Sequence, residues 1–573
     1  MKNLTHANIA GGGANSSLNS LSAKSLNNSK RFFTPIVASS LALFLSAGIA
    51  NAAAKDCSSV AGASSDPKIC YEYRQNDRNP TGNLTAVTNL TDLTWEDNGG
   101  ILTPKAGGAS LNYLEFQFNA GGGQAPAGAT AGAGGYRITS GGIGLTQVIV
   151  LDAGTKSIEM ANQAGGIGGK LSVIFGEGAD STRQFHLNLS KATGDFSFKG
   201  NIVIQAGKGW AGGGAGASKF VGDFGRKVVG DITISNRSGG NQSGHRTELT
   251  FTNDAGLEGN LTTKAGTTTA TFANGNITGN VVVDDALGGF TLAKNIITFN
   301  GQDNKIQGKV VAEGGAMNNS MGVNQITFEN GGSIDGEVQA GRGQNTITIK
   351  GTTGTIKGNV LSSNSGKNTI TMESTTSTLE GNVQAHAAGS SSVTSTNEIT
   401  FKNAGATIKG SVSVAGNNYA NAKGVNTITF QNGGTIEGEV KATSGENKIT
   451  FNGTGDATLN QRVWGDFDAI QQHRGKNTIT MESSGTNTIK GGVHEQTANN
   501  IITMGGATAT IEGGVKAIGN GYQNVDGKGN TTFGNTIKMK GTTSAIKGGI
   551  SADEGFNTIE FGETGTPITS ATI

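Results

Sequence analysis

Hydrophobic and polar residues alternate in a short template that recurs along most of the chain. One copy runs from Asn345 to Val360 and reads N-T-I-T-I-K-G-T-T-G-T-I-K-G-N-V. In its counterpart Asn426–Phe430, Ile428 and Phe430 share one face and two threonines share the other, because side chains alternate along a strand. A strand repeat with a period of about 20 to 50 residues is typical of a solenoid.

The asparagine that opens each copy shows how the repeat is spaced. It recurs at steps of 21 to 35 residues, at Asn295, Asn324, Asn345, Asn368, Asn397, Asn426, Asn447, Asn477, Asn500, Asn535 and Asn557. Most of the variation falls in one segment, the 7 to 20 residues between the last valine of a copy and the next asparagine. We therefore predict an all-β fold, a parallel β-solenoid with coils of about 21 residues and insertions at one corner.

The two halves of each copy predict two strands per coil. In Ile436–Val440 we expect Ile436, Gly438 and Val440 to point inward, with the glycine leaving room for a neighbouring Phe or Met. We interpret the opening asparagines as a ladder of turn residues, because Asn tolerates the left-handed conformation and bonds its own backbone.

One polar column predicts how the coils align. The residue after the Ile or Leu of each second half alternates in charge, with one neutral exception, through Asp335, Lys357, Glu380, Lys409, Glu437, Asn460, Lys490, Glu512 and Lys547. Stacked coils would place these side chains beside one another, so opposite charges attract. We expect the column to set the register and not to bind a ligand.

Composition alone would allow disorder, since the chain has 94 Gly in 573 residues and 15% charged residues. The regular Ile, Val and Phe columns argue against disorder. We expect degenerate coils over residues 131–246 and regular coils over residues 247–573.

Residues 1–52 read as a secretory signal peptide with a long n-region. Four cations and no acid precede an apolar run from Ile36 to Ala50, and Ala50-Asn51-Ala52 at its end reads as a cleavage site. An uncleaved anchor is the alternative, but the run is short for a membrane span of about 20 residues. Without the leader, 39 cations face 42 acids. This charge near neutrality gives no case for binding nucleic acid.

Residues 53–130 form an irregular region that we expect to cap the first coil. Cys57 and Cys70 are the only cysteines, and in an exported protein we expect them to form one local disulfide. A cap would cover the open strand edge of the first coil, which would otherwise favour aggregation.

The sequence contains few motifs that indicate catalysis or cofactor binding. Gly207–Gly212 matches G-x-G-x-x-G, but in so glycine-rich a chain such matches arise by chance, and no helix follows it to bind a pyrophosphate. We expect no catalytic residues, no metal site and no cofactor.

The strongest candidate for a ligand site is the long corner after Val463. It interrupts the most degenerate coil, where Gln461 replaces the usual glycine. Exposed aromatics beside carboxylates, His and Arg could bind a sugar or a protein. The alternative is a folded loop whose aromatic residues cover the coil edge. The candidate residues are Trp464, Asp466, Phe467, Asp468, His473 and Arg474.

The signal peptide, the two early cysteines and the Gly/Asn/Thr-rich repeats together resemble the passenger of a Gram-negative autotransporter. The N-x-I-T-F and I-x-G-x-V motifs are similar to those of vacuolating-cytotoxin-like autotransporters. The resemblance covers nearly the whole chain by pattern and implies a right-handed β-helix at the cell surface or released from it. That family ends in an outer-membrane β-barrel, whereas this sequence stops at Ile573 within its repeats. We expect either a fragment without its barrel or export by a separate translocator.

These observations favour a structural or adhesive role without catalysis. The expected partners are a host-cell surface protein or glycan and an outer-membrane translocator, in cis or in trans. Two alternatives stay open. A toxin-like passenger would need an apolar segment that enters membranes, and a polysaccharide-degrading enzyme would need paired carboxylates in a groove.

Overall fold

The computed structural model describes residues 70–73, 85–86, 93–119, 130–132, 135–141, 148–162, 168–175, 184–206, 219–236, 246–264, 266–284, 293–314, 321–363, 366–386, 394–415, 424–443, 445–466, 476–496, 499–518, 534–553, 555–562 and 568–573. All of them belong to the compact unit Lys55–Ile573. The other unit, Met1–Ala54, contains the predicted signal peptide and lies outside the described residues.

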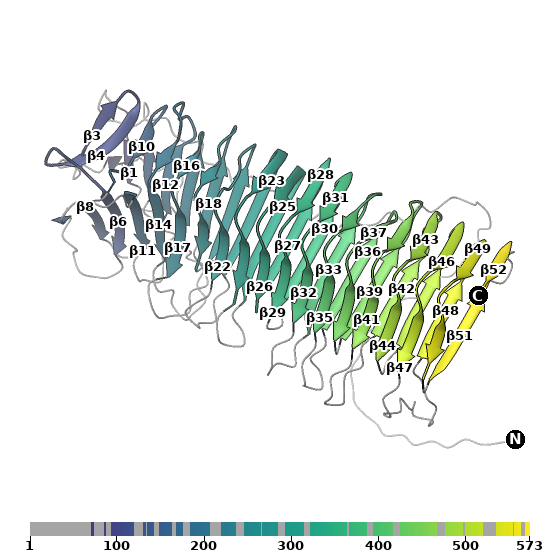
Figure 1. Ribbon diagram of the computed structural model, residues 1–573. Helices are drawn as coiled ribbons and strands as arrows, with labels where there is room; N and C mark the ends of the chain where they lie inside the picture. The colour runs from purple at the N-terminus through teal and green to yellow at the C-terminus, as the bar shows by residue number, and fades with distance from the viewer. Residues whose placement is uncertain are drawn as a thin grey trace, which may run out of the picture. The chain divides into compact units, whose positions relative to one another are not determined.

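Within the described residues every regular element is a strand, and the strands stack coil on coil in parallel (Figure 1). The predicted parallel β-solenoid is therefore confirmed. Each regular coil contributes a first, a second and a third strand, and equivalent residues of neighbouring coils lie opposite one another. Asn345 pairs with Asn368, for example, and Val360 pairs with Val383.

The first strands of successive coils form one continuous parallel stack. They are β9 (Val148–Asp152), β12 (Gln184–Leu189), β15 (Lys219–Phe224), β18 (Arg246–Phe251), β21 (Thr267–Phe272), β23 (Ala293–Ile306), β25 (Gly322–Ile334), β27 (Gln344–Ile349), β30 (Lys367–Met372), β33 (Ser395–Phe401), β36 (Gly424–Phe430), β39 (Gly445–Phe451), β42 (Lys476–Met481), β45 (Asn499–Met504), β48 (Gly534–Met539) and β51 (Phe556–Phe561).

The second strands are shorter, and in β23 and β25 the second strand is continuous with the first. The separate ones are β4 (Ile101–Ala106), β10 (Ser157–Glu159), β13 (Phe198–Lys199), β16 (Val228–Val229), β19 (Leu257–Glu258), β28 (Thr353–Ile356), β31 (Thr376–Leu379), β34 (Thr407–Ile408), β37 (Gly434–Ile436), β40 (Ala457–Leu459), β43 (Thr486–Ile489), β46 (Thr508–Ile511), β49 (Thr543–Ile546) and β52 (Ser570–Thr572).

The third strands form a sheet of their own. They are β6 (Tyr113–Asn119), β8 (Gly135–Gly141), β11 (Lys170–Phe175), β14 (Asn201–Ala206), β17 (Ile232–Asn236), β20 (Leu261–Thr263), β22 (Val281–Asp284), β24 (Val310–Glu313), β26 (Val338–Gly341), β29 (Val360–Ser363), β32 (Val383–His386), β35 (Val412–Ala415), β38 (Val440–Thr443), β41 (Val463–Asp466), β44 (Val493–Gln496), β47 (Val515–Ile518) and β50 (Ile550–Ala552).

Antiparallel strands gather at the N-terminal end of the stack. They are β1 (Cys70–Tyr73), β2 (Thr85–Ala86), β3 (Leu93–Asn98), β5 (Ala109–Ser110) and β7 (Thr130–Gly132). β4 pairs in parallel with β10, and β3 pairs with β4 in antiparallel fashion as the outermost strand of this sheet. Cys57 and the side chain of Cys70 lie outside the described residues, so the expected disulfide stays a prediction.

Ile436 and Val440 lie on different strands, which corrects the expected two-strand coil. Ile436 ends β37 and Val440 begins β38, with a turn between them. Gly438 occupies that turn, where a Cβ would lie 2.2 Å from the carbonyl oxygen of Gly410 in the preceding coil. The glycine is needed because backbones approach closely between coils, and not to make room for Phe or Met.

The core is built from inward columns of like residues. Phenylalanines that end the first strands stack on one another with ring centroids 4.3–5.1 Å apart, in two runs: Phe224, Phe251, Phe272, Phe299 and Phe328, and then Phe401, Phe430 and Phe451. All eight are at most 1% exposed. Aromatic contacts of this kind add to the free energy gained by burial of the rings.

The opening asparagines form a buried ladder inside the stack. Along the described residues each asparagine from Asn295 to Asn535 donates its side-chain Nδ2–H to Oδ1 of the next one, over 2.8–3.3 Å. These donors are at most 1% exposed. The prediction of left-handed turn residues was wrong, because these asparagines are strand residues whose amides are satisfied by neighbouring coils. We call this row the asparagine ladder.

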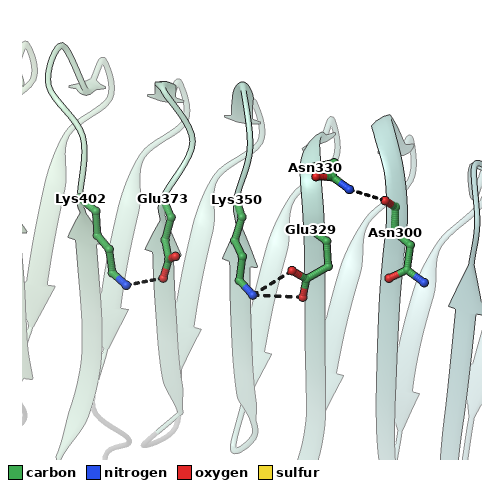
Figure 2. A network of polar contacts seen from close by, with 6 residues as sticks. All are labelled: Asn300, Glu329, Asn330, Lys350, Glu373 and Lys402. Carbon is green, nitrogen blue, oxygen red and sulfur yellow. Dashed lines mark hydrogen bonds and ion pairs between the residues drawn. The ribbon is translucent and has the colours of Figure 1, made fainter. Parts of the chain in front are cut away.

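Outward polar side chains also join neighbouring coils. In the predicted charge column, Lys357 pairs with Asp335, Lys409 with Glu380 and Lys547 with Glu512, at 3.1–3.5 Å, so the column does link coils. A second charged column just after the first strands had not been predicted. Figure 2 shows it, with the ion pairs Glu329–Lys350 (2.9 Å) and Glu373–Lys402. Nearby, Asn330 donates to the carbonyl of Asn300 in the preceding coil.

The variable-length segments all connect a third strand to the first strand of the next coil. Only one residue separates β38 from β39, whereas nine separate β41 from β42. Insertions therefore occur at one corner, as predicted. The long corners begin where the third strands end, which makes the outer face of those strands the surface to examine for a ligand site.

Candidate functional site

Trp464 lies on the outer face of the third strands. It follows the inward Val463 of β41, and alternation along the strand directs it outward, where it is half-buried. The parallel register places Lys441 of β38 beside it on one side and His494 of β44 on the other, and Lys516 of β47 comes next. Together with Arg462 these residues form what we call the Trp464 surface.

Two cations contact the Trp464 ring. Lys441 Nζ and Arg462 Cζ each lie 4.2 Å from the ring centroid, within the range of cation–π attraction. Glu439 of the preceding coil accepts hydrogen bonds from Arg462, from Nε at 3.1 Å and from an Nη at 2.8 Å. The ring is thus fixed in place by groups from two coils, and less conformational entropy would be lost when it packs against a ligand.

The pKa of His494 is affected by the positive charge of this surface. Its burial, followed by the positive charges of Arg462 and Lys516, lowers its pKa below the ordinary value. Its ring lies over Gly492, where a Cβ would come within 2.5 Å of Nε2. At neutral pH His494 is therefore an uncharged imidazole among cations, suited to hydrogen bonding.

The structure describes only part of the predicted ligand site. Trp464 lies on the outer face as expected, and Asp466 ends β41, although only its backbone is described. Phe467, Asp468, His473 and Arg474 lie outside the described residues. Their role stays a prediction.

Sequence reasoning did not find Lys441, His494 and Lys516. Each is the first residue after the valine that begins a third strand, as Trp464 is. Aligning the coils on that valine would have brought the four positions into one column. The sequence therefore contained this signal, but it becomes apparent only when the third strands are recognised as separate strands and aligned with one another.

The described residues give no sign of other site chemistry. Among them no group of three or more His, Cys, Asp or Glu residues could hold a metal ion. The same residues include no helix long and apolar enough to span a membrane. The Trp464 surface itself presents a ring, three cations and an imidazole, groups that can take part in non-covalent recognition.

No family model, curated protein or solved structure matches this chain.

Proposed function

We propose that the protein is an exported, non-catalytic β-solenoid that binds a host-cell surface protein or glycan through the Trp464 surface. Export follows from the leader in residues 1–52 and needs an outer-membrane translocator, in cis or in trans. The stack serves as a scaffold that presents this surface at the cell exterior or in released form.

One observation carries the proposal: an aromatic ring lies on an outer sheet face, fixed by Lys441 and Arg462, directly before a long corner. Tryptophan and arginine dominate the binding energy of many protein interfaces. A half-buried ring with ordered neighbours makes a larger contact than the short polar side chains in equivalent positions of earlier coils, such as Ser413 and Gln384.

The test is binding of the purified chain to host cells and to an array of immobilised glycans. We expect saturable binding that falls at least tenfold in Trp464→Ala, with a matched control, Gln384→Ala, that leaves it unchanged. Gln384 is the outward residue at the same position of β32. Equal binding by both variants would remove Trp464 from the proposal, and no binding by the parent chain would overturn the adhesive function.

A further inference from the structure

A second outer surface of the stack, on the first strands, carries an unbroken column of threonines. They lie three residues after the asparagine-ladder position in successive coils, and in-register pairing aligns them. Within the described residues the column consists of Thr250, Thr271, Thr298, Thr327, Thr348, Thr371, Thr400, Thr429, Thr450, Thr480 and Thr503. From Thr271 onward all are half-exposed.

A second column runs beside the first, one residue after the ladder position. It is mostly uncharged and contains Thr269, Ile296, Gln325, Thr346, Thr369, Glu398, Thr427, Lys448, Thr478 and Ile501. We call the two columns together the threonine face. Two further outward columns border it, one just before the ladder and one just after the first strands.

The threonine face and its two bordering columns are together large enough for a stable interface. Ten coil steps of about 4.8 Å give a length of about 48 Å, and the four columns span about 20 Å across the strands. The resulting area of about 1,000 Å² exceeds the roughly 800 Å² that each partner contributes to a standard protein interface.

The side chains of this face are suited to packing against another sheet. Threonine is branched at Cβ, so its χ1 is restricted and its methyl and hydroxyl groups repeat at fixed positions from coil to coil. Columns of identical short side chains at a spacing of 4.7–4.8 Å are the surfaces that interdigitate when sheets pair face to face. Such a surface loses little conformational entropy on association.

We propose that the threonine face binds the threonine face of a second copy of this chain, around a two-fold axis parallel to the direction of stacking. A two-fold interface uses the same patch on both subunits. This axis reverses the strand direction while each coil faces its own counterpart. The two threonine columns then face each other, and each bordering column faces the other bordering column.

The charges in the bordering columns agree with this axis. Lys367 faces Glu373 of the partner subunit, and Lys476 faces Glu482 of the partner subunit. Among the described residues of these columns, from the coil of Asn295 to that of Asn535, none faces a like charge. The remaining pairs join a charged or neutral residue to a neutral one, as Gln344 to Lys350 of the partner subunit. Charge complementarity of this kind selects partner and register.

The first experiment measures the molar mass of the purified chain by size-exclusion chromatography with light scattering over a range of concentrations. We expect a dimer that dissociates on dilution, and a monomer at every concentration would overturn the proposal. Thr348→Arg with Thr429→Arg should raise the dissociation constant at least tenfold. Thr378→Arg with Thr435→Arg is the matched control, because these outward threonines lie on the second strands β31 and β37 and should leave the dimer intact.

A charge exchange tests the axis itself and does not depend on bulky substitutions. Lys476→Glu places two carboxylates opposite each other, and Glu482→Lys places two ammonium groups opposite each other, so each variant alone should be monomeric. An equimolar mixture should form a heterodimer, since each substituted side chain then faces an opposite charge on the other variant. Dimers of either variant alone, or no heterodimer in the mixture, would exclude this arrangement. Circular dichroism and thermal melting confirm that each variant is folded.

Discussion

The Nζ of Lys357 lies 3.1 Å from Oδ1 of Asp335, one coil back along the stack. Lys305 of the preceding coil approaches the other oxygen of the same carboxylate at 2.5 Å. Burial raises the pKa of Asp335, but hydrogen bonds and positive charge from Lys305 and Lys357 outweigh it and hold the pKa below the ordinary value. Asp335 therefore joins three coils through two ion pairs.

Asp335 should make stability depend on pH in the acid range. Because its pKa is lower in the folded chain than in the unfolded chain, its contribution is complete above the unfolded value of 3.8 and is lost as pH falls through the folded pKa. Asp335→Asn should lower the free energy of unfolding at pH 7 by up to about 1 kcal/mol, given the partial exposure of the pair. Urea unfolding at pH 7 and at a series of pH values below 3.8 checks this, and a difference that does not decrease as the pH falls would contradict it.

His494 should make stability depend on pH in a higher range than Asp335 does. Its folded pKa is lowered, so protonation favours the unfolded chain, and the contribution of the neutral imidazole is complete above the unfolded value of 6.5. Stability should fall as pH drops from 6.5 through the folded pKa. In His494→Gln that loss should be absent between pH 7 and pH 5. A chain whose melting temperature has the same pH profile with and without His494 would disprove the assignment.

The asparagine ladder should be sensitive to a single deletion. Asn426→Ala removes the acceptor of Asn397 Nδ2 and the donor to Asn447 Oδ1, both at 3.1 Å in the parent chain. Each buried group left unsatisfied costs about 1–3 kcal/mol. Denaturant unfolding should show this loss, whereas Thr435→Ala, at an outward position of β37, should change stability by about 0.5 kcal/mol or less.

The turn glycines should not tolerate even a methyl group. At Gly358 a Cβ would lie 2.2 Å from the carbonyl oxygen of Gly336, a backbone atom that cannot move without shifting its coil. Gly358→Ala should therefore destabilise the chain by about 1–3 kcal/mol. Gly549 is the control, because a Cβ there meets nothing within 4 Å. Similar melting temperatures for Gly358→Ala and Gly549→Ala would contradict the close-approach argument.

The sequence predicted the stack because its signal is periodic. Ile428 and Phe430 alternate with threonines, and this alternation alone indicates a strand with one buried face. It did not reveal that Ile436 and Val440 belong to different strands, since Ile-x-Gly-x-Val has the same period of two that an unbroken strand would have. The close approach of Gly438 to the backbone of the preceding coil shows that the segment between Ile436 and Val440 is a turn and not part of a strand.

The asparagine ladder and the neighbours of Trp464 were missed for a related reason. Asn426 opens its copy of the repeat where a turn residue is expected, but its role depends on the amide of Asn447, 21 residues away. Trp464 was recognised as unusual, but its neighbours Lys441 and His494 become visible only when the third strands are aligned. Contacts between coils, which a linear pattern does not contain, decide both features.

The asparagine ladder also gives the stack an electrical direction. Each amide donates toward the later coil, so the side-chain dipoles add along the row, whereas strand dipoles in sheets leave only a small net moment. The partial positive end lies at Asn557, and the partial negative end at Asn295 is satisfied by the hydroxyl of Thr263. Aligned hydrogen bonds polarise one another. The interior of this solenoid is therefore polarised along its length, from its N-terminal coils toward its C-terminal ones.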